Sequence, residues 1–358
     1  MKILIFSNYS GYFGSEKSLE DIFAALKDNN CVKTYMNPSV EIPSWYRIKN
    51  NVRCVDMNVL SKGRMRLSLN TVWKISQILR NEKPDKVIVN ISLMPEVMFA
   101  CRIMGIKLYV FVRESLSDYP KLYWLYRKFL IWVSEKLITN SKYTSMMLNG
   151  RDKVSLLYNR IDPPEGFSLE TALAKTRYDY DLTFVGRLSE RKGVLSFLSA
   201  LNVLDSKLER TIKVAFVGNV KRGEEYILSR IFQAQADFKR VKITLFEFQN
   251  DPYPLIQASR ALVAPSLLPE TFGRILIEGC CVGTPVVSSD SGAYSEINPL
   301  QQLVFNRNSE SDFVNKLEYI LKLSTAELKI LKKKAIISAR KYQFENFKKT
   351  LVSVILND

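Results

Sequence analysis

The sequence predicts an α/β protein built from two doubly wound domains. Two observations carry this prediction: short β-rich apolar runs alternate with helical patterns along the chain, and the alternation forms two series of similar size. Alternating strands and helices favour parallel sheets that are covered by helices on both faces. A length of 358 residues also favours two domains, each able to bury its own core.

The expected elements follow in order. Strands of the first series are expected at 2–7, 31–36, 52–57, 86–91, 107–112, 136–140 and 154–158, and those of the second at 181–186, 212–217, 241–246, 261–264 and 285–288. The run Pro163-Pro164-Glu165-Gly166 can continue neither a helix nor a central strand. We therefore expect a first domain at 1–165, a second at 166–343 and a closing amphipathic helix within 344–358.

Composition limits the chemistry. The net charge is +16, and residues 1–165 hold 25 basic against 15 acidic residues, which indicates an anionic partner or a basic solubilising surface. The absence of histidine excludes Ser-His-Asp and Cys-His nucleophiles and His-ligated metals. Five cysteines without C-x-x-C spacing favour a reduced, cytoplasmic protein. No apolar run approaches the roughly 20 residues that span a bilayer.

The most informative stretch is 269–287. Glu270 precedes an expected helix, Gly273 lies in its first turn, and Glu278 follows eight residues after Glu270, roughly 12 Å along the axis. The backbone N–H groups at the helix start, where anions bind, are those of Thr271, Phe272 and Gly273. One carboxylate near a sugar, the amides near a diphosphate and the second carboxylate near a ribose would fit a nucleotide sugar. A capping carboxylate and an exposed helical glutamate are the alternative.

A basic loop, GRLSERKG, runs from Gly186 to Gly193 after the expected strand 181–186. A loop between a strand and a helix suits a phosphate site at the carboxyl end of a parallel sheet. Arg187 can fork onto phosphate oxygens, and Lys192 can add a point charge. The alternative is a solvated charged loop.

These two stretches resemble the E-x7-E motif and the G-R-l-x-x-x-K-G loop of retaining glycosyltransferases with the GT-B fold, in particular glycosyltransferase family 4. The resemblance implies two Rossmann-like domains facing across a cleft, with the C-terminal helix crossing back to the first domain. It implies that Glu270 holds the hexose hydroxyls and Glu278 the ribose. Arg187 and Lys192 would neutralise the departing diphosphate, without a metal or any other cofactor.

The expected activity follows from the same resemblance. A hexose would pass from a nucleotide-diphosphate sugar, bound mainly by the second domain, to a saccharide or lipid-linked saccharide acceptor on the first. The transfer would retain the anomeric configuration and would serve bacterial surface polysaccharide assembly, such as that of lipopolysaccharide. A non-catalytic GT-B protein that binds nucleotide sugars or glycans is the alternative. A nucleic-acid-binding protein is a third, although no nucleic-acid motif appears.

Two segments of the first half resemble parts of this family. Gly11–Ser18 nearly forms a P-loop, but Glu16 replaces its second glycine and would repel phosphate. It resembles instead the family's G-G-a-E turn, in which Gly14 would approach the donor and Phe13 replaces the first glycine. Arg113 and Glu114 resemble an H-V-R-E segment, with Phe111 in the histidine place, and are expected on the acceptor side. A structural ion pair between Arg113 and Glu114 is the alternative.

Three shorter patterns complete the comparison. Asn159-Arg160-Ile161-Asp162 resembles the N-G-x-D that closes the first domain, with Arg160 in place of glycine. Asp179-Tyr180-Asp181 precedes a strand rather than following one, so we expect no metal there. The loop 289–296 resembles a d-x-g-G-x-x-E loop that lines the donor site.

Basic and aromatic residues gather at two places in the first half. One is Lys62-Gly63-Arg64-Met65-Arg66, and the other is a helix in which Trp124, Lys128 and Trp132 share a face. Both could contact an anionic membrane surface peripherally. The expected location is therefore the cytoplasm, with possible contact at the inner face of the cytoplasmic membrane; packing and solvation are the alternative.

Overall fold

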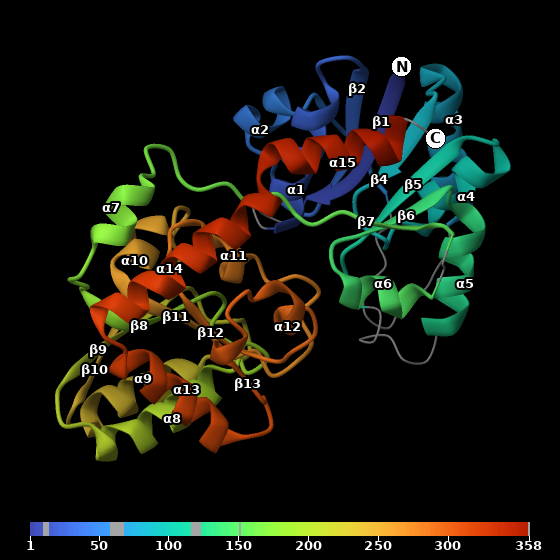
Figure 1. Cartoon of the computed structure of the whole chain (residues 1–358). Helices are drawn as coiled ribbons and strands as arrows, with labels where there is room; N and C mark the ends of the chain where they lie inside the picture. Colours follow the sequence, from blue (N-terminus) through green and yellow to red (C-terminus); the bar gives the residue numbers. More distant parts are fainter. Residues whose placement is uncertain (10–13, 58–67, 116–122, 150–151, 357–358) are drawn as a thin grey trace. The chain divides into compact units, whose positions relative to one another are not determined.

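A computed structural model describes residues 1–9, 14–57, 68–115, 123–149 and 152–356 (Figure 1). The chain divides into two compact units, one of Met1–Arg160 with Phe344–Asp358 and one of Ile161–Gln343. We expected the domain boundary after residue 165, and the unit boundary lies after Arg160. Each unit contains one parallel sheet, which confirms the prediction of an α/β fold with two doubly wound domains.

The sheet of the first unit has seven strands in the order β3-β2-β1-β4-β5-β6-β7. Its strands are β1 (Lys2–Tyr9), β2 (Cys31–Pro38), β3 (Val52–Cys54), β4 (Lys86–Val89), β5 (Lys107–Val112), β6 (Lys136–Thr139) and β7 (Val154–Leu156). Its helices are α1 (Gly14–Leu26), α2 (Ser44–Lys49), α3 (Leu69–Glu82), α4 (Pro95–Ile103), α5 (Tyr123–Val133), α6 (Lys142–Leu148) and α15 (Phe344–Leu356).

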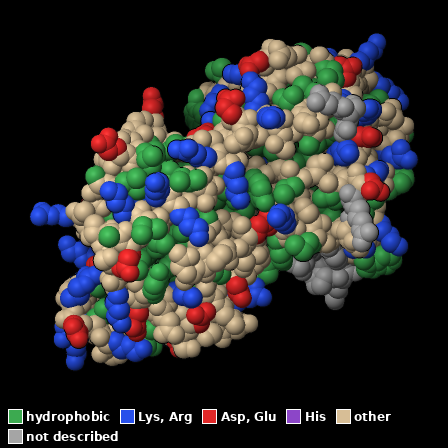
Figure 2. Space-filling model, in the orientation of Figure 1, with side chains coloured by type: hydrophobic (Ala, Val, Ile, Leu, Met, Phe, Trp, Pro, Cys, Tyr) green, Lys and Arg blue, Asp and Glu red, His purple; other side chains and the backbone are tan. Residues whose placement is uncertain are grey.

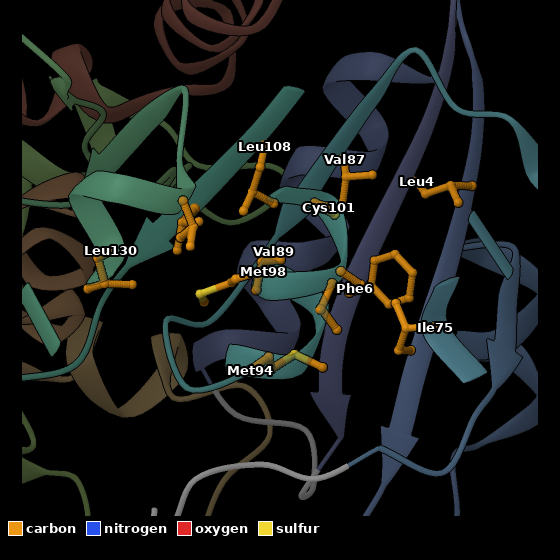
Figure 3. Close-up of a cluster of buried hydrophobic side chains, with 14 of the residues drawn as sticks. Leu4, Phe6, Ile75, Val87, Val89, Met94, Met98, Cys101, Leu108 and Leu130 are labelled. Atoms are coloured by element: carbon orange, nitrogen blue, oxygen red, sulfur yellow. The ribbon is translucent and has the colours of Figure 1, made fainter. Parts of the chain in front are cut away.

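Alternation along the buried strands sends side chains to two cores. Ile3 and Ile5 of β1 join the cluster that includes α1 and α15 residues. Leu4 and Phe6, one step out of phase, join the cluster with α3, α4 and α5 residues. Figure 3 shows Leu4 and Phe6 beside side chains of the neighbouring strand β4 and of helices α3 and α4. Both faces of the sheet are therefore covered.

Helix α15 belongs to the first unit although it ends the chain. Its buried residues Phe347, Leu351 and Ile355 lie in the same core cluster as the α1 side chains. Lys348 Nζ lies 2.9 Å from Asp28 Oδ2 at the surface of this contact. The amphipathic pattern of 344–356 thus buries its apolar stripe on the first unit's core.

The sheet of the second unit has six strands in the order β10-β9-β8-β11-β12-β13. They are β8 (Tyr180–Val185), β9 (Ile212–Val217), β10 (Val241–Phe246), β11 (Ser259–Ala264), β12 (Val286–Ser289) and β13 (Val304–Phe305). The helices are α7 (Leu169–Ala174), α8 (Val194–Lys207), α9 (Tyr226–Asp237), α10 (Tyr253–Gln257), α11 (Arg274–Cys281), α12 (Tyr294–Ile297), α13 (Glu310–Lys322) and α14 (Thr325–Ala339), with 3-10 turns Gln301–Leu303 and Arg340–Tyr342. Helices α8, α9 and α13 pack together, and α11 packs with α10 and α14 (Figure 1).

Several strand ends differ from the predicted ones. The predicted strand 86–91 ends at Val89. Asn90 follows it, and its side-chain amide donates to Ser7 Oγ at 3.2 Å and to Ser15 O at 3.0 Å. The predicted strands 52–57 and 154–158 end at Cys54 and Leu156. Strand β13 was not predicted, because two residues are too few to show a strand pattern.

The strand order reverses once in each sheet. In the first unit the reversal lies between β1 and β4, and in the second it lies between β8 and β11. Ligands of open α/β sheets bind at the carboxyl ends of the strands beside such a switch point. The loops that follow β8 and β11 are therefore where a site of the second unit is expected.

Glu82 is the electrostatic centre at the amino edge of the first sheet. Lys2 and Lys33 place their Nζ atoms 2.7 and 2.8 Å from its Oε2, and Arg53 and Tyr35 contact its Oε1. Hydrogen bonds from Lys2 and Lys33 lower the pKa of Glu82 to about 2. A carboxylate whose pKa falls on folding stabilises the fold above its unfolded pKa, and that stabilisation disappears as the pH falls towards the folded pKa.

We therefore predict that Glu82→Gln lowers the free energy of unfolding at pH 7 by roughly 1–3 kcal/mol. The difference from wild type should shrink between about pH 4.5 and pH 2, because wild type loses this contribution there. Urea unfolding across this pH range measures both effects. Glu41→Gln, at an exposed position, is the control and should change little. A Glu82→Gln penalty that is equal at pH 2 and pH 7 would contradict the assignment.

Candidate functional site

The basic loop Gly186–Gly193 and the stretch that begins at Pro265 follow the adjacent strands β8 and β11. They therefore meet at the switch point of the second sheet. Gly193 begins α8 with a φ of +75°, and a Cβ there would lie 1.9 Å from Pro265 O. Only glycine permits this approach, so the residue type at 193 brings the two loops into contact.

The contact between the two loops brings Lys192 next to Glu270. Lys192 Nζ lies 2.7 Å from Glu270 Oε1, which also accepts a hydrogen bond from Ser266 Oγ at 3.0 Å. The Lys192 side chain is 31% exposed and that of Glu270 is 14% exposed, so the ion pair is reachable by a ligand. Ser266 Oγ also lies 3.2 Å from the Tyr294 hydroxyl oxygen. Four polar side chains from three segments thus form one cluster.

Charge in this cluster follows from its burial and its neighbours. Burial alone would lower the pKa of Lys192, but Tyr294 and Glu270 outweigh it and raise the pKa above its ordinary value. Burial also raises the pKa of Tyr294 to about 12. Near pH 7 Lys192 is therefore an ammonium and Tyr294 a neutral hydroxyl, so Glu270 is the charged partner of Lys192.

Arg187 differs from Lys192 in its surroundings. Its side chain is exposed, and it forms no hydrogen bond or ion pair with any residue that the structure describes. The loop around it is anchored: Leu188 N donates to Asn219 O at 2.9 Å, and Glu190 N donates to Glu224 Oε2 at 2.8 Å. The backbone thus holds Arg187 just after Gly186, at the end of β8, with its guanidinium available to an anion.

The helix after Glu270 begins later than predicted. Gly273 is the N-cap of α11 with a φ of +90°, a left-handed conformation that an interior helical residue does not adopt. The helix therefore begins at Arg274, and Thr271 and Phe272 precede it. The expected placement of Gly273 in the first turn and the 12 Å axial estimate are wrong, because Glu270 lies in an isolated bridge with Gly292, outside the helix.

Phe272 and Gly273 also have packing roles. Phe272 is buried and meets the Tyr342 ring edge-on, with centroids 5.8 Å apart. A Cβ at Gly273 would lie 2.3 Å from Tyr294 Cε1, so only glycine lets the Tyr294 ring reach Ser266. Thr271 is half-buried between Glu270 and Phe272.

Glu278 lies on α11 with its side chain 14% exposed. Arg274 Nε lies 3.4 Å from its Oε1, a contact between residues one helical turn apart. Burial is the largest cause of a raised pKa of Tyr253, and the charge of Glu278 is the second. The Tyr253 phenol therefore lies near Glu278. The sequence predicted that Glu278 binds the ribose. It did not predict that Arg274 would be a partner of this carboxylate within the protein.

The predicted residues of the first unit lie at or near the carboxyl edge of its sheet. Gly14 begins α1, while residues 10–13 of the same turn lie outside the described residues. Glu114 Oε2 accepts hydrogen bonds from Ser92 N at 3.2 Å and Ser92 Oγ at 2.5 Å. Arg113 Nη1 donates to Asn159 Oδ1 at 2.8 Å. Glu114 thus links the loops that follow β4 and β5, and Arg113 reaches towards the end of the unit.

Arg160 and Asp181, two residues of the shorter patterns, have structural roles. Arg160, which replaces glycine, places Nη1 3.2 Å from Asp21 Oδ1 and stacks over the Phe344 ring at 4.3 Å. It therefore fastens α1 to the start of α15. Asp181 accepts hydrogen bonds from Arg210 Nη2 at 2.7 Å and Lys213 N at 2.9 Å, so its carboxylate supports the strand entry, as predicted.

Helix α5 carries the basic-aromatic surface predicted for the first unit. Trp124 and Trp132 are 52% and 50% exposed, and Lys128 Nζ lies 5.0 Å from the Trp124 ring centroid. Lys62–Arg66 lies outside the described residues. Basic side chains are spread over the face drawn in Figure 2 rather than gathered in one patch. Among the described residues, no helix has the length and apolar character that crossing a membrane requires.

Ser266, Tyr294, Arg191 and Arg274 were not among the predicted site residues. Arg191 Nη2 donates to Pro269 O at 2.9 Å and so holds the loop before Glu270. Arg274 could have been found from its i, i+4 spacing to Glu278. The sequence placed Tyr294 in the loop 289–296, which was expected to line the donor site, but it did not indicate that Tyr294 meets Ser266, 28 residues earlier.

Comparisons with known proteins agree with this geometry. Residues 171–341 match the family model described as Glycosyl transferases group 1. An uncharacterized glycosyltransferase of Methanocaldococcus jannaschii is 26% identical over 179 residues, which are 47% of this chain and 44% of that relative, so the match spans less than half of either.

Solved structures resemble the whole chain. HepE of Anabaena, solved in complex with UDP, superimposes with a TM-score of 0.80 at 17% identity over 100% of both chains. HepE has also been solved with UDP-glucose, with a TM-score of 0.78 and 17% identity over 100% of both chains. WaaG, described as a glycosyltransferase involved in lipopolysaccharide biosynthesis, gives 0.71 at 16% identity over 100% of both chains. Residues 171–341 therefore resemble the group 1 glycosyl transferases, and the chain as a whole has the GT-B fold.

Proposed function

We propose that this protein is a retaining glycosyltransferase. It takes a hexose from a nucleotide-diphosphate sugar held by the second unit and passes it to a saccharide or lipid-linked saccharide acceptor. The observation that carries the proposal is the cluster at the switch point, where exposed Arg187 lies in the same loop as the Lys192–Glu270 ion pair. HepE, which has the same fold, binds UDP and UDP-glucose, and WaaG acts in lipopolysaccharide biosynthesis. These neighbours support a nucleotide-sugar donor and a role in bacterial surface polysaccharide assembly.

The diphosphate is the leaving group and gains negative charge as the glycosidic bond breaks. Arg187 can donate two parallel hydrogen bonds to its oxygens, and the Lys192 ammonium adds a point charge beside them. Donors placed where charge develops lower the barrier without reorganising. These two side chains would do the work that a metal ion does in other glycosyltransferases, so we propose that the reaction requires neither a metal nor another cofactor.

Glu270 would orient the transferred sugar. Its Oε1 accepts hydrogen bonds from Lys192 and Ser266, which hold the carboxylate in place beside the diphosphate position. Acceptor attack from the face that the diphosphate leaves would keep the anomeric configuration. The chain has no histidine, so we propose that a leaving phosphate oxygen takes the acceptor proton. Arg113 and Glu114 remain the proposed acceptor-side residues of the first unit.

Glu278 would accept hydrogen bonds from the ribose hydroxyls. Its Arg274 contact at 3.4 Å is long and engages one carboxylate oxygen, so the carboxylate can still take a diol. The Tyr253 phenol lies near this carboxylate, and burial together with the charge of Glu278 raises the pKa of Tyr253 and keeps it neutral. This contact would exist before and during the reaction alike.

The first prediction concerns the diphosphate clamp. Arg187→Ala and Lys192→Ala should each lower the transfer rate by about 100-fold or more, because each removes a group that stabilises developing charge. Transfer from radiolabelled nucleotide sugars measures this. Lys207→Ala removes a lysine that is 54% exposed and distant in sequence, and it should retain full activity. Full activity in either clamp variant, or strict dependence on added Mn²⁺ after chelation, would refute this mechanism.

The second prediction separates the two glutamates. Glu278→Gln should chiefly weaken binding of the free nucleotide diphosphate, because uniform binding appears in affinity rather than in turnover. Glu270→Gln should chiefly lower turnover. Calorimetry and steady-state kinetics distinguish the two effects. Arg274→Met tests the ion pair by itself: it should leave nucleotide affinity nearly intact. Equal losses in Arg274→Met and Glu278→Gln would mean that the ion pair, not a ribose contact, explains Glu278.

The third prediction concerns the α5 surface of Trp124, Lys128 and Trp132. We propose that it makes a peripheral contact with anionic bilayers, where each nearby basic residue contributes about 1 kcal/mol and interfacial tryptophan adds to it. Wild type should float with anionic but not neutral vesicles at low salt. Changing the three residues to Gln, Glu and Gln should abolish flotation, whereas Trp73→Gln with Lys74→Glu on α3 should not. Equal flotation of both variants would refute the assignment.

A further inference from the structure

A cavity of about 460 Å³ lies at the amino edge of the second unit's sheet. Three of its lining residues come just before strands: Tyr178 before β8, Gln257 before β11 and Thr284 before β12. These strands are parallel, so their amino ends share one edge of the sheet. Lys192 and Glu270 lie at the opposite, carboxyl edge. The cavity therefore lies at the other edge of the sheet from Lys192 and Glu270; of its lining residues, Tyr253 also lies near Glu278.

Helices α7 and α14 form one wall of this cavity, and they pack against each other (Figure 1). Lys332 is a residue of α14, and Lys175 is the C-cap residue that follows α7. Phe167 and the Tyr178 ring supply apolar surface, while the polar groups of Gln257 and Thr284 lie on the sheet side. A volume of this size is typical of sites for metabolite-sized ligands.

Lys332 is the unusual residue of the cavity. It is 4% exposed, and its Nζ donates to Lys175 O and to the Tyr178 hydroxyl, both at 3.3 Å. The Tyr178 hydroxyl in turn donates to Lys175 O at 3.0 Å. Both acceptors are neutral. Among the residues that the structure describes, the Lys332 ammonium has no carboxylate partner, and its remaining contact is with the Tyr178 ring, 5.6 Å from Nζ.

A buried ammonium without a counter-ion is unfavourable, which is why buried lysines are normally paired. Burial and the nearby charge of Lys175 lower the pKa of Lys332 to about 8. The acidic lining residues do not compensate: Glu165 and Asp251 are exposed, and Asp251 Oδ1 accepts the backbone N–H of Tyr253 at 3.0 Å. Within the described part of the chain, this cation thus has no anionic partner.

We propose that this cavity binds a small organic anion whose carboxylate or phosphate group pairs with Lys332 Nζ. The anion would supply the missing counter-charge and would also approach Lys175, whose Nζ lies 5.9 Å from the Tyr178 ring centroid. The uncharged part of the ligand would lie against the rings of Tyr178 and Phe167. This second site would be independent of the proposed transfer reaction.

Glucose, gluconate and glucose 6-phosphate are matched probes, because they share a hexose skeleton and differ in charge. Cyanate, a small reagent for neutral amines, would label Lys332 near pH 8, and peptide mapping would quantify the label at this residue alone. At ten times its dissociation constant, gluconate, glucose 6-phosphate or both should slow labelling about tenfold, because the free site is then about one tenth of the total. Glucose should have no effect. Which charged probe protects tells whether the site prefers a carboxylate or a phosphate.

Thermal unfolding of variants supplies a second measurement. The protecting anion should raise the melting temperature of wild type and of Lys333→Met, a control one residue along α14 that is exposed. Lys332→Met should lose that increase while UDP binding is unchanged. Arg187→Ala should keep the protection of Lys332, which separates this site from the nucleotide-sugar site. No protection by either charged probe, or equal protection by glucose, would overturn the proposal, and the labelling result does not require any variant to fold.

Discussion

The reversal of strand order between β8 and β11 is the constraint on which the site of the second unit depends. At that point the loops after two adjacent parallel strands diverge to opposite sides of the sheet, so neither covers the other. Gly193 brings the two loops into contact, because the absence of a Cβ lets the loop after β8 reach Pro265 in the loop after β11. Lys192 and Glu270, 78 residues apart, meet as a consequence.

Electrostatics gives the two edges of this sheet different characters. At the carboxyl edge the Lys192 ammonium is paired with Glu270, and its raised pKa keeps it charged. At the amino edge the Lys332 ammonium donates to two neutral oxygens and lies over the Tyr178 ring, and its pKa is lowered. The first arrangement holds a charge ready for a reacting anion. The second leaves a charge without compensation, which is the basis for expecting a ligand there.

Much of the fold could be predicted from local patterns. The runs 107–112, 212–217 and 241–246 are strands with the predicted bounds, because β-branched and aromatic residues in short runs favour strands. The order of those strands in each sheet requires contacts between distant segments. The start of α11 was also misplaced, since whether Gly273 continues a helix or caps it depends on the Tyr294 ring that packs against it.

The sequence by itself determined the residue types that the proposed chemistry needs: a basic loop with Arg187 and Lys192, two spaced glutamates and no histidine. Only the tertiary structure decided which of them touch. Glu278 contacts Arg274, one helical turn away. Glu270 accepts hydrogen bonds from Lys192 and Ser266, and Ser266 in turn contacts Tyr294, so residues distant in the sequence form this cluster. The uncompensated charge of Lys332 is likewise a tertiary property. Local spacing shows which side chains share a turn, but burial and long-range pairing arise only when the sheet brings distant loops together.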